Sequence, residues 1–244
     1  MVNVVCMKWG NKYDAKYVNI LRSMVERNLD IDHRFVCFTE HSEGIREDVE
    51  IFPLPELSLP NGIHERCWRK LSLFEDRLAD LEGTTLFLDL DVVIVGRLEP
   101  FFDVEGEFFI SHDWKWYGPQ KITGNSSCIR FEIGKHQDII DDFKANQETV
   151  RKTIRNEQEF LSLKMHEKGC LNYWPDNWCC SFKAHCMPKI PFRYFQEPTY
   201  PDGTRVVIFH GDPNPPEAAQ PGFISPRKCW KASTWINDFW YEAA

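Results

Sequence analysis

The 244-residue sequence lacks several features that would each indicate a class of protein. No window approaches the roughly 18 consecutive apolar residues of a membrane span. The first residues, MVNVVCMKWG, are apolar over too short a stretch for a secretory signal, so we expect a cytoplasmic protein. The nine cysteines include no CxxC pair, and their odd number and scatter predict reduced core thiols rather than a disulfide framework.

Basic residues are also fewer than acidic residues. The chain carries 29 Lys and Arg against 37 Asp and Glu, a formal net charge of −8. A balance of this sign argues against a broad electrostatic surface for nucleic acid or anionic lipid, and we expect no nucleic-acid partner. Any phosphate group would have to be bound by a few residues gathered at one place.

Large apolar side chains are plentiful, with 43% hydrophobic and 14% aromatic residues. This composition and the length predict one globular α/β domain over residues 1–244. Patterning predicts strands at Val2–Met7, Arg34–Thr39, Val49–Phe52, Thr84–Leu90, Glu107–Ser111, Ser126–Phe131 and Arg205–His210. It predicts helices at Asp14–Asn28, Trp68–Leu81, Gln137–Asn146, Glu157–Glu167 and in the tail CWKASTWINDFWYEAA. The tail's aromatic residues would dock on the body, with peripheral membrane contact as the alternative.

Two carboxylates, Asp89 and Asp91, interrupt the apolar stretch TTLFLDLDVVIV. Thr84–Leu90 is apolar on both faces, as expected of a central strand covered by helices. Residues two apart in an extended chain point the same way, so both carboxylates converge beyond the strand end, where α/β sheets bind ligands. Two like charges in an apolar frame need a cation, and oxygen ligands favour Mg²⁺ or Mn²⁺ with open positions for phosphate. An exposed pair that caps a turn is the alternative.

A histidine follows the last predicted strand. His210 ends the apolar run RVVIF and opens a glycine turn, so its imidazole could complete the metal shell from a second strand end. A structural histidine with satisfied hydrogen bonds is the other interpretation.

Several features, in this order, resemble glycosyltransferase family 8, the group that contains glycogenin and lipopolysaccharide galactosyltransferases. They extend from about residue 2 to residue 216 and are the amino-terminal βα unit, WRKLSLFED before LFLDLD, GNSSCIRFE, NEQEFL and FHGDPNPP. The resemblance implies a GT-A (nucleotide-diphospho-sugar transferase) fold, with a mostly parallel central sheet flanked by helices and a Rossmann-like N-terminal half. Residues 1–95 would form the nucleotide-binding half, residues 96–226 the donor-sugar and acceptor half, and residues 227–244 a C-terminal helix.

The resemblance also implies an activity, that of a hexosyltransferase. Its donor would be a nucleotide sugar, expected to be a UDP-sugar, and its acceptor a glycan or glycoconjugate. Asp89, Asp91 and His210 would hold Mn²⁺ or Mg²⁺ against the diphosphate. Lys70 would contact the phosphates or brace the acidic pair.

Further residues are assigned by the same resemblance. Asp113 would accept hydrogen bonds from the donor-sugar hydroxyls, and Asn125 would line the same pocket. Gln158 would lie near the reacting face of the sugar, with Glu157 beside it. The loop KWGNKY would surround the nucleotide base, and its candidate residues are Lys8, Trp9 and Tyr13.

The chain departs from the family pattern in two places. The family usually has a diphosphate-binding lysine after the histidine, followed by Pro-Trp, whereas Asn214 stands at the similar position here. Lys228 and Arg227 are candidate substitutes. Ser126 and Ser127 replace a small Ala-Gly pair, which would alter the acceptor pocket.

Two other functions stay open. FLDLDVV also resembles the first motif of haloacid-dehalogenase-like phosphatases, whose first aspartate is a nucleophile beside Mg²⁺. This interpretation is disfavoured because 88 residues precede the motif and the later Asp-Asp pair, 141–142, falls on a predicted helix. The other alternative is a non-catalytic nucleotide-sugar-binding protein.

Overall fold

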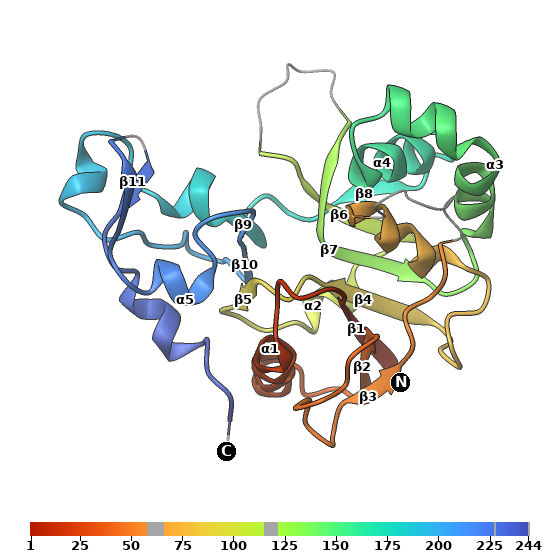
Figure 1. Cartoon of the computed structure of the whole chain (residues 1–244), viewed down its shortest axis with the longest axis horizontal. Helices are drawn as coiled ribbons and strands as arrows, with labels where there is room; N and C mark the ends of the chain where they lie inside the picture. The colour runs from red at the N-terminus through yellow and green to blue at the C-terminus, as the bar shows by residue number, and fades with distance from the viewer. Residues whose placement is uncertain (58–65, 115–121, 227, 244) are drawn as a thin grey trace.

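The computed structural model describes residues 1–57, 66–114, 122–226 and 228–243 (Figure 1). Its centre is a seven-stranded sheet in the order β3-β2-β1-β4-β7-β6-β8. The strands are β1 (Val2–Lys8), β2 (His33–Thr39), β3 (Glu50–Phe52), β4 (Thr84–Leu88), β6 (Phe108–His112), β7 (Gly124–Glu132) and β8 (Leu171–Tyr173). Only β7 runs antiparallel to its neighbours in this sheet. The mostly parallel α/β sheet predicted from the sequence is therefore confirmed.

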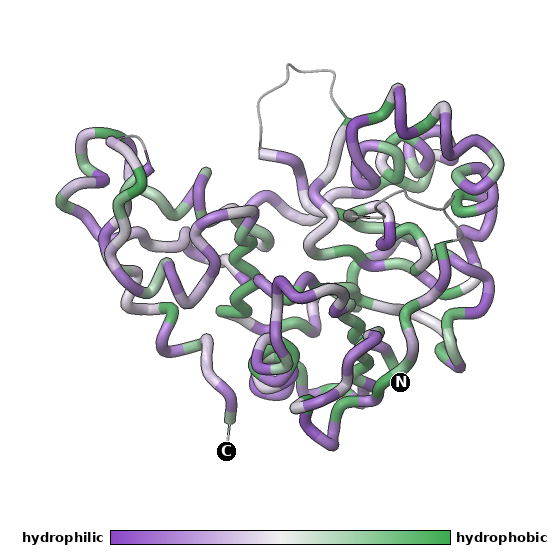
Figure 2. Tube along the Cα trace, viewed as in Figure 1, coloured by the Kyte–Doolittle hydropathy of each residue, from purple (hydrophilic) through white to green (hydrophobic). Residues whose placement is uncertain are grey.

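Both faces of this sheet are buried. Alternate residues of β4 enter different cores, Leu86 and Leu88 on one face and Phe87 on the other. The helix α1 (Ala15–Asn28) packs on the first face. On the second face lie α3 (Gln137–Thr153), α4 (Glu157–Glu167) and the 3₁₀ helix η1 (Arg66–Phe74). Figure 2 shows the resulting hydrophobic colouring along the central strands.

A smaller part of the molecule lies beside the large sheet (Figure 1). Its three-stranded sheet has the order β5-β10-β9, with β5 (Val92–Ile94), β10 (Val206–Ile208) and β9 (Cys179–Ser181). The elements of the chain that belong to neither of these two sheets nor to the helices named above are α2 (Pro100–Asp103), η2 (Phe182–Cys186), η3 (Phe192–Tyr194), α5 (Pro215–Ala218), β11 (Gly222–Ser225), β12 (Lys228–Trp230) and η4 (Thr234–Asp238). The chain passes from the large sheet to the small one through residues 89–91, so the acidic pair lies at their junction.

Two predicted helices are wrong. Instead of an α-helix over Trp68–Leu81, η1 ends at Phe74, and Ala79 has a φ of 53° that no right-handed helix accommodates. The tail is not a continuous helix, because Lys228–Trp230 pairs with β11 as a hairpin and only the short 3₁₀ turn η4 follows. Tertiary pairing has overridden the local pattern in this segment.

None of the helices within the described ranges combines the length and the apolar character that a membrane crossing requires. All nine cysteines are free thiols, and seven of them are buried.

Candidate active site

The acidic pair lies at the carboxyl end of β4, where the main chain is held on both sides. The backbone N–H of Asp89 donates to the carbonyl of Ser127 at 2.9 Å, which extends the β4–β7 ladder by one bond. Asp91 leads directly into β5. A pocket of about 300 Å³ opens at this point. It is lined by Met7, Trp9, Lys12, Tyr13, Cys67, Lys70, Asp89, Leu90 and Asp91.

Five of the residues predicted from the sequence therefore meet in one pocket, and Lys70 is bound most tightly among them. Its Nζ donates to the two carboxylate oxygens of Asp89 at 2.7 and 2.8 Å. It also donates to the carbonyl and Oγ of Ser126 at 3.3 and 3.2 Å. Burial alone would lower the pKa of Lys70, but the carboxylates of Asp89 and Glu157 outweigh it, and the pKa is raised. Lys70 thus braces the acidic pair as a full cation.

Asp91 is less well compensated. Only 7% of its surface is exposed, and the hydroxyl of Tyr13 donates to its Oδ2 at 2.6 Å. Burial, followed by the charge of Asp89, raises the pKa of Asp91 to about 6 despite the opposing effects of Tyr13, Lys12 and Lys70. A divalent cation against both carboxylates would remove this cost. In chemistry and placement, the two carboxylates fit Mg²⁺ or Mn²⁺.

His210 comes to the same junction from the other sheet. β10 pairs antiparallel with β5 so that Ile208 lies opposite Val92, and His210 leaves β10 at the end where Asp91 enters β5. Its Nε2 lies 2.7 Å from Ser181 Oγ. Because Ser181 Oγ accepts from the N–H of Ala184, its own proton is available to His210 Nε2. Nε2 is thereby engaged with Ser181 and would have to leave this contact to bind a metal ion.

The three-residue metal set is accordingly not preformed. Over the described ranges, no group of three or more His, Cys, Asp and Glu side chains is arranged to hold a metal ion. The two carboxylates fit such an ion as they stand, whereas His210 as the third ligand stays a prediction.

Two of the three predicted sugar-binding residues, Gln158 and Asn125, lie beside Ser126, which Lys70 also contacts. Gln158 Oε1 accepts from the N–H of Ser126 at 3.4 Å, and Asn125 Oδ1 accepts from the N–H of Ser127 at 3.0 Å. Both residues thus lie next to the segment that Lys70 contacts. None of the pocket-lining residues is Asn125, Gln158 or Asp113.

Asp113 follows β6 directly, and its side chain is 7% exposed. Its Oδ2 lies 3.8 Å from a guanidinium nitrogen of Arg155. The following residue, Trp114, stacks on the His210 ring with centroids 6.0 Å apart. Trp114 also lines a second pocket, of about 390 Å³, together with His112, Trp174 and His185. Trp116 and Tyr117 of the same aromatic loop lie outside the described residues.

Comparison with solved structures bears on this arrangement. The galactosyltransferase LgtC, in complex with donor and acceptor sugar analogues, is 21% identical with a TM-score of 0.60, over 87% of this chain and 88% of that one. An LgtC active-site mutant with glutamine changed to glutamate is 20% identical, also with a TM-score of 0.60, over 87% and 89% of the two chains. The chain has the GT-A fold. The glycosyltransferase GlyE of Streptococcus pneumoniae TIGR4 is 14% identical with a TM-score of 0.55, over 88% of this chain and 56% of its own.

No protein-family model and no curated protein matches the sequence. The GT-A fold is therefore established by the three-dimensional likeness, at identities where the sequence alone carries little information.

In the loop KWGNKY, which is predicted to surround the nucleotide base, Lys12 lines the pocket and Lys8 does not. Lys8 is buried and donates to the carbonyl of His41, and Lys12 of the same loop lines the pocket instead. In a strand, successive side chains point to opposite sides, so the end of β1 directs Lys8 away from the pocket. The loop sequence KWGNKY contains Lys12 as well as Lys8, but no pattern within it distinguishes the two lysines.

Two more charged residues lie at the site: Glu157, predicted only as a neighbour of Gln158, and Lys183, which the sequence does not single out. Glu157 is 2% exposed and accepts from Ser126 Oγ at 2.6 Å, which joins it to the Lys70 and Asp89 network. Lys183 Nζ donates to the carbonyl of His210 at 2.6 Å. No sequence pattern connects Lys183 with His210, because the parallel pairing of β9 and β10 brings them together.

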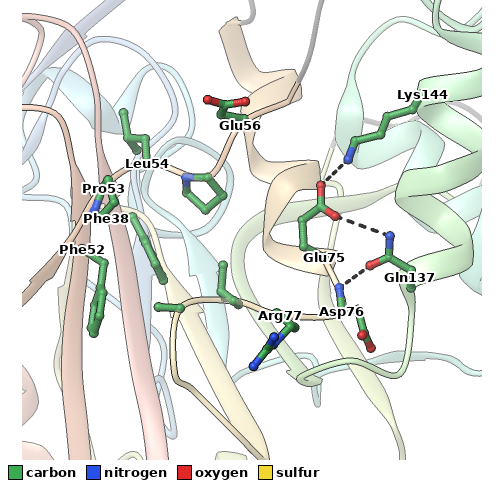
Figure 3. A pocket seen from close by; sticks show the side chains of 13 residues that line it. Phe38, Phe52, Pro53, Leu54, Glu56, Glu75, Asp76, Arg77, Gln137 and Lys144 are labelled. Carbon is green, nitrogen blue, oxygen red and sulfur yellow. Dashed lines mark hydrogen bonds and ion pairs between the residues drawn. The ribbon is translucent and has the colours of Figure 1, made fainter.

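A larger cavity, of about 610 Å³, contains none of the residues predicted for the site (Figure 3). Phe38, Phe52 and Leu54 form one wall. Three of its polar residues bond to one another, because Glu75 accepts from both Lys144 and Gln137. Size alone therefore does not identify the functional pocket.

Proposed function

We propose that this chain is a metal-dependent glycosyltransferase that moves a hexose from a nucleotide-diphosphate sugar, a UDP-sugar, to a hydroxyl group of a saccharide or glycoconjugate. The observation that carries the proposal is the pair of Asp89, half-buried and braced by Lys70, and Asp91, buried, in the lining of a pocket beyond β4. The GT-A fold supports it, as does the likeness to LgtC, a galactosyltransferase that binds donor and acceptor sugar analogues.

The chemistry requires stabilisation of a leaving group. As the bond from the sugar to the diphosphate breaks, negative charge accumulates on a phosphate oxygen. A divalent ion supplies Lewis-acid stabilisation of that charge when it is bound. Asp89 and Asp91 would hold the ion, and Lys70 fixes the orientation of Asp89. His210, which contacts Ser181 through Nε2, would be the third ligand.

The walls of the pocket suit the rest of the donor. Trp9 and Tyr13 offer aromatic surface for the base, and Lys12 brings a cation to the pocket. Gln158, Asn125 and Asp113 would bind the hexose. The Gln158 assignment gains support from LgtC, where a glutamine is an active-site residue.

Lys183 is the candidate for the missing diphosphate lysine. It is tied to the His210 carbonyl from η2, next to the loop in which Asn214 stands at the family's lysine position. Lys228 lines a neighbouring pocket with Lys183 and Asp212, whereas Arg227 lies outside the described residues. Lys183, which precedes His210 in the sequence, would thus take the place of the lysine that the family has after the histidine.

The acceptor would occupy the 390 Å³ pocket on the other side of Trp114. This pocket combines aromatic walls, Trp114 and Trp174, with polar groups such as Asp176 and Asn177. Aromatic faces with a few polar groups are the usual composition of a sugar-binding surface.

Release of free nucleotide diphosphate from a panel of nucleotide sugars, measured with Mn²⁺ and with mixed glycan acceptors, tests the proposal. We expect one donor to be turned over, and Asp89→Ala or Asp91→Ala to lower the rate by about a hundredfold or more. Asp103→Ala, which changes an exposed carboxylate on α2, is the matched control. Near-normal turnover in the Asp91 variant would overturn the assignment.

The same assay separates the alternatives. A phosphatase would hydrolyse an aryl phosphate and ignore nucleotide sugars. A non-catalytic protein would be stabilised against heat by a nucleotide sugar without releasing the diphosphate.

A further inference from the structure

A cavity of about 430 Å³ lies between the start of α1 and the last residues of the chain, and we call it the tail cavity. Among the described residues, it shares none of its lining with the pocket of the acidic pair. Figure 1 shows the chain running from α5 past α1 to its C-terminus. The tail cavity is lined by Asp14, Lys16, Tyr17, Ile20, Pro216, Trp240, Tyr241 and Glu242. Three of these residues are aromatic and two are acidic.

The aromatic side chains of the tail cavity form a corner. The rings of Tyr17 and Trp240 have centroids 5.3 Å apart and planes inclined by 70°. Tyr241 follows directly in the chain, with 43% of its surface exposed. The face of an aromatic ring carries partial negative charge, so rings that meet at an angle attract a cation placed against them. The corner therefore suits a positively charged group with an apolar surface.

The corner is held in place before any ligand arrives. Tyr17 packs on Tyr13 with ring centroids 4.6 Å apart. The carbonyl of Phe239, the neighbour of Trp240, accepts a hydrogen bond from Arg27 of α1 at 2.7 Å. The preceding turn η4 packs on α5. Binding to a preorganised corner orders few side chains, which keeps the entropic cost of association low.

The charges around the tail cavity favour a cation. Its two carboxylates, Asp14 and Glu242, are both exposed, and the Asp14 side chain makes no capping hydrogen bond to α1. The basic residue of the lining, Lys16, is also exposed. Burial, followed by the charge of Glu217, raises the pKa of Tyr17 to about 12, so its hydroxyl stays protonated. The rings thus lie in a field to which three carboxylates contribute.

A cation of the chain itself already uses this corner. The guanidinium carbon of Arg27 lies 3.9 Å from the centroid of the Tyr241 ring. Arg27 is not among the described residues that line the tail cavity. A contact between a cation and an aromatic face is therefore formed beside the cavity, and the cavity offers room for a second one.

We propose that the tail cavity binds a small quaternary ammonium compound such as choline. Its methyl groups would pack on Tyr17 and Trp240, and Asp14 and Glu242 would balance its charge. A primary ammonium carries three N–H donors that need acceptors, whereas a quaternary ammonium has none and loses little when it meets aromatic faces. This site is separate from the transfer reaction, and its existence does not depend on that reaction.

Calorimetric titration of the full chain with choline chloride, with NaCl titrated as a blank, tests the proposal. We expect one site with a Kd of about 1 mM. Dimethylbutanol, the uncharged carbon analogue of choline, should bind at least about tenfold more weakly. Phosphocholine, the form of the same group in lipid headgroups, should also bind more weakly, because its phosphate would meet Asp14 and Glu242.

Two variants test the lining of the cavity. Asp14→Asn with Glu242→Gln keeps the shape of both side chains and should weaken choline binding about fivefold. Trp240→Leu removes one side of the corner and should weaken it about tenfold or more. Thermal melts verify that each variant is folded. Because Trp240 also attaches the tail to α1, the carboxylate variant carries the test if Trp240→Leu unfolds.

The chain offers a matched control for each variant. Asp103→Asn with Glu105→Gln removes two exposed carboxylates elsewhere, and Phe223→Leu removes an exposed ring elsewhere. Both controls should bind choline like the parent. Equal binding of choline and dimethylbutanol, tighter binding of phosphocholine than of choline, or parent-like affinity in the carboxylate variant would each overturn the proposal. Titration of the parent without a saturable heat from choline would overturn it as well.

Discussion

At the scale of single residues, the site is a set of charges with unequal compensation. Asp89 has Lys70 on both of its oxygens, while Asp91 has the neutral hydroxyl of Tyr13. The two carboxylates are two residues apart, yet their removal should have opposite effects on the free energy of unfolding. The sequence indicated the pair but could not show this difference, because it depends on which residue reaches each oxygen.

Asp91→Asn should stabilise the metal-free protein at pH 7.5 by about 1–3 kcal/mol, because it removes a buried charge and keeps an acceptor for Tyr13. Asp89→Asn should destabilise it by roughly 2 kcal/mol or more, because Lys70 loses its main partner. Urea unfolding in the presence of a chelator measures both changes. A loss of stability in the Asp91 variant would contradict this picture of the site.

His136 is a buried residue outside the site whose protonation should affect stability. Burial lowers the pKa of His136, with a further lowering from Lys168, and its ring packs edge-on against Phe74 and Phe108. A lowered folded pKa means that the unfolded chain takes up a proton first as the pH falls through about 6.5. The contribution of His136 to stability should therefore decline between pH 7.5 and pH 5.5, whereas that of Asp91, whose pKa is raised, changes in the opposite direction.

His136→Phe should remove this contribution, and His41→Phe, at an exposed position, should behave like the parent. Thermal melts at the two pH values measure the difference, and the same pH dependence in all three proteins would contradict the prediction.

At the scale of elements, α4 shows what sequence patterns can determine. The predicted bounds Glu157–Glu167 match the structure because Asn156 caps the helix, accepting from the N–H of Glu159 at 3.2 Å. The η1 segment shows the limit, since apolar residues three apart serve a 3₁₀ helix as well as an α-helix. The antiparallel direction of β7 is likewise invisible in its sequence, because it is defined by pairing with the distant strand β4 and with β6.

The cap on α4 yields a prediction, because the first turn of the helix holds Glu157 and Gln158 against Ser126. Asn156→Ala should lower the free energy of unfolding by about 1 kcal/mol and also reduce transfer activity. Asn156→Asp keeps an acceptor for the N–H of Glu159 and should retain both properties. Urea unfolding and nucleotide release on the same preparations measure them; equal stability of the two variants would show that the cap contributes nothing.

At the scale of the whole molecule, the site depends on contacts between distant parts of the chain. His210 and Lys183 reach the acidic junction only through the pairings of β10 with β5 and β9. The order of motifs allowed His210 to be proposed, whereas Lys183 was unrecognisable before the small sheet was seen. The sequence of the tail predicts a helix for the same reason. In the structure its aromatic residues contact the body separately, Trp235 at Pro198 and Trp240 at Tyr17.

The tail closes over α1 and should contribute to the stability of the whole domain. The Phe239 carbonyl accepts from Arg27 at 2.7 Å, and Trp240 packs on Tyr17. Trp240→Ala should therefore lower the free energy of unfolding by about 2 kcal/mol, less than for a fully buried tryptophan. Phe223→Ala removes an aromatic ring that is 71% exposed and should change little. Thermal unfolding compares the two, and an equal effect would mean that the tail is not docked in solution.

The most direct test of the central claim is a Mn²⁺ titration in the presence of UDP, followed by the electron paramagnetic resonance signal of the free ion. The parent chain should bind one ion, and Asp89→Asn and Asp91→Asn should each weaken binding by about tenfold or more. Asp32→Asn, at an exposed position, should bind like the parent. Unchanged Mn²⁺ affinity in the Asp91 variant would show that the acidic pair does not hold the metal ion.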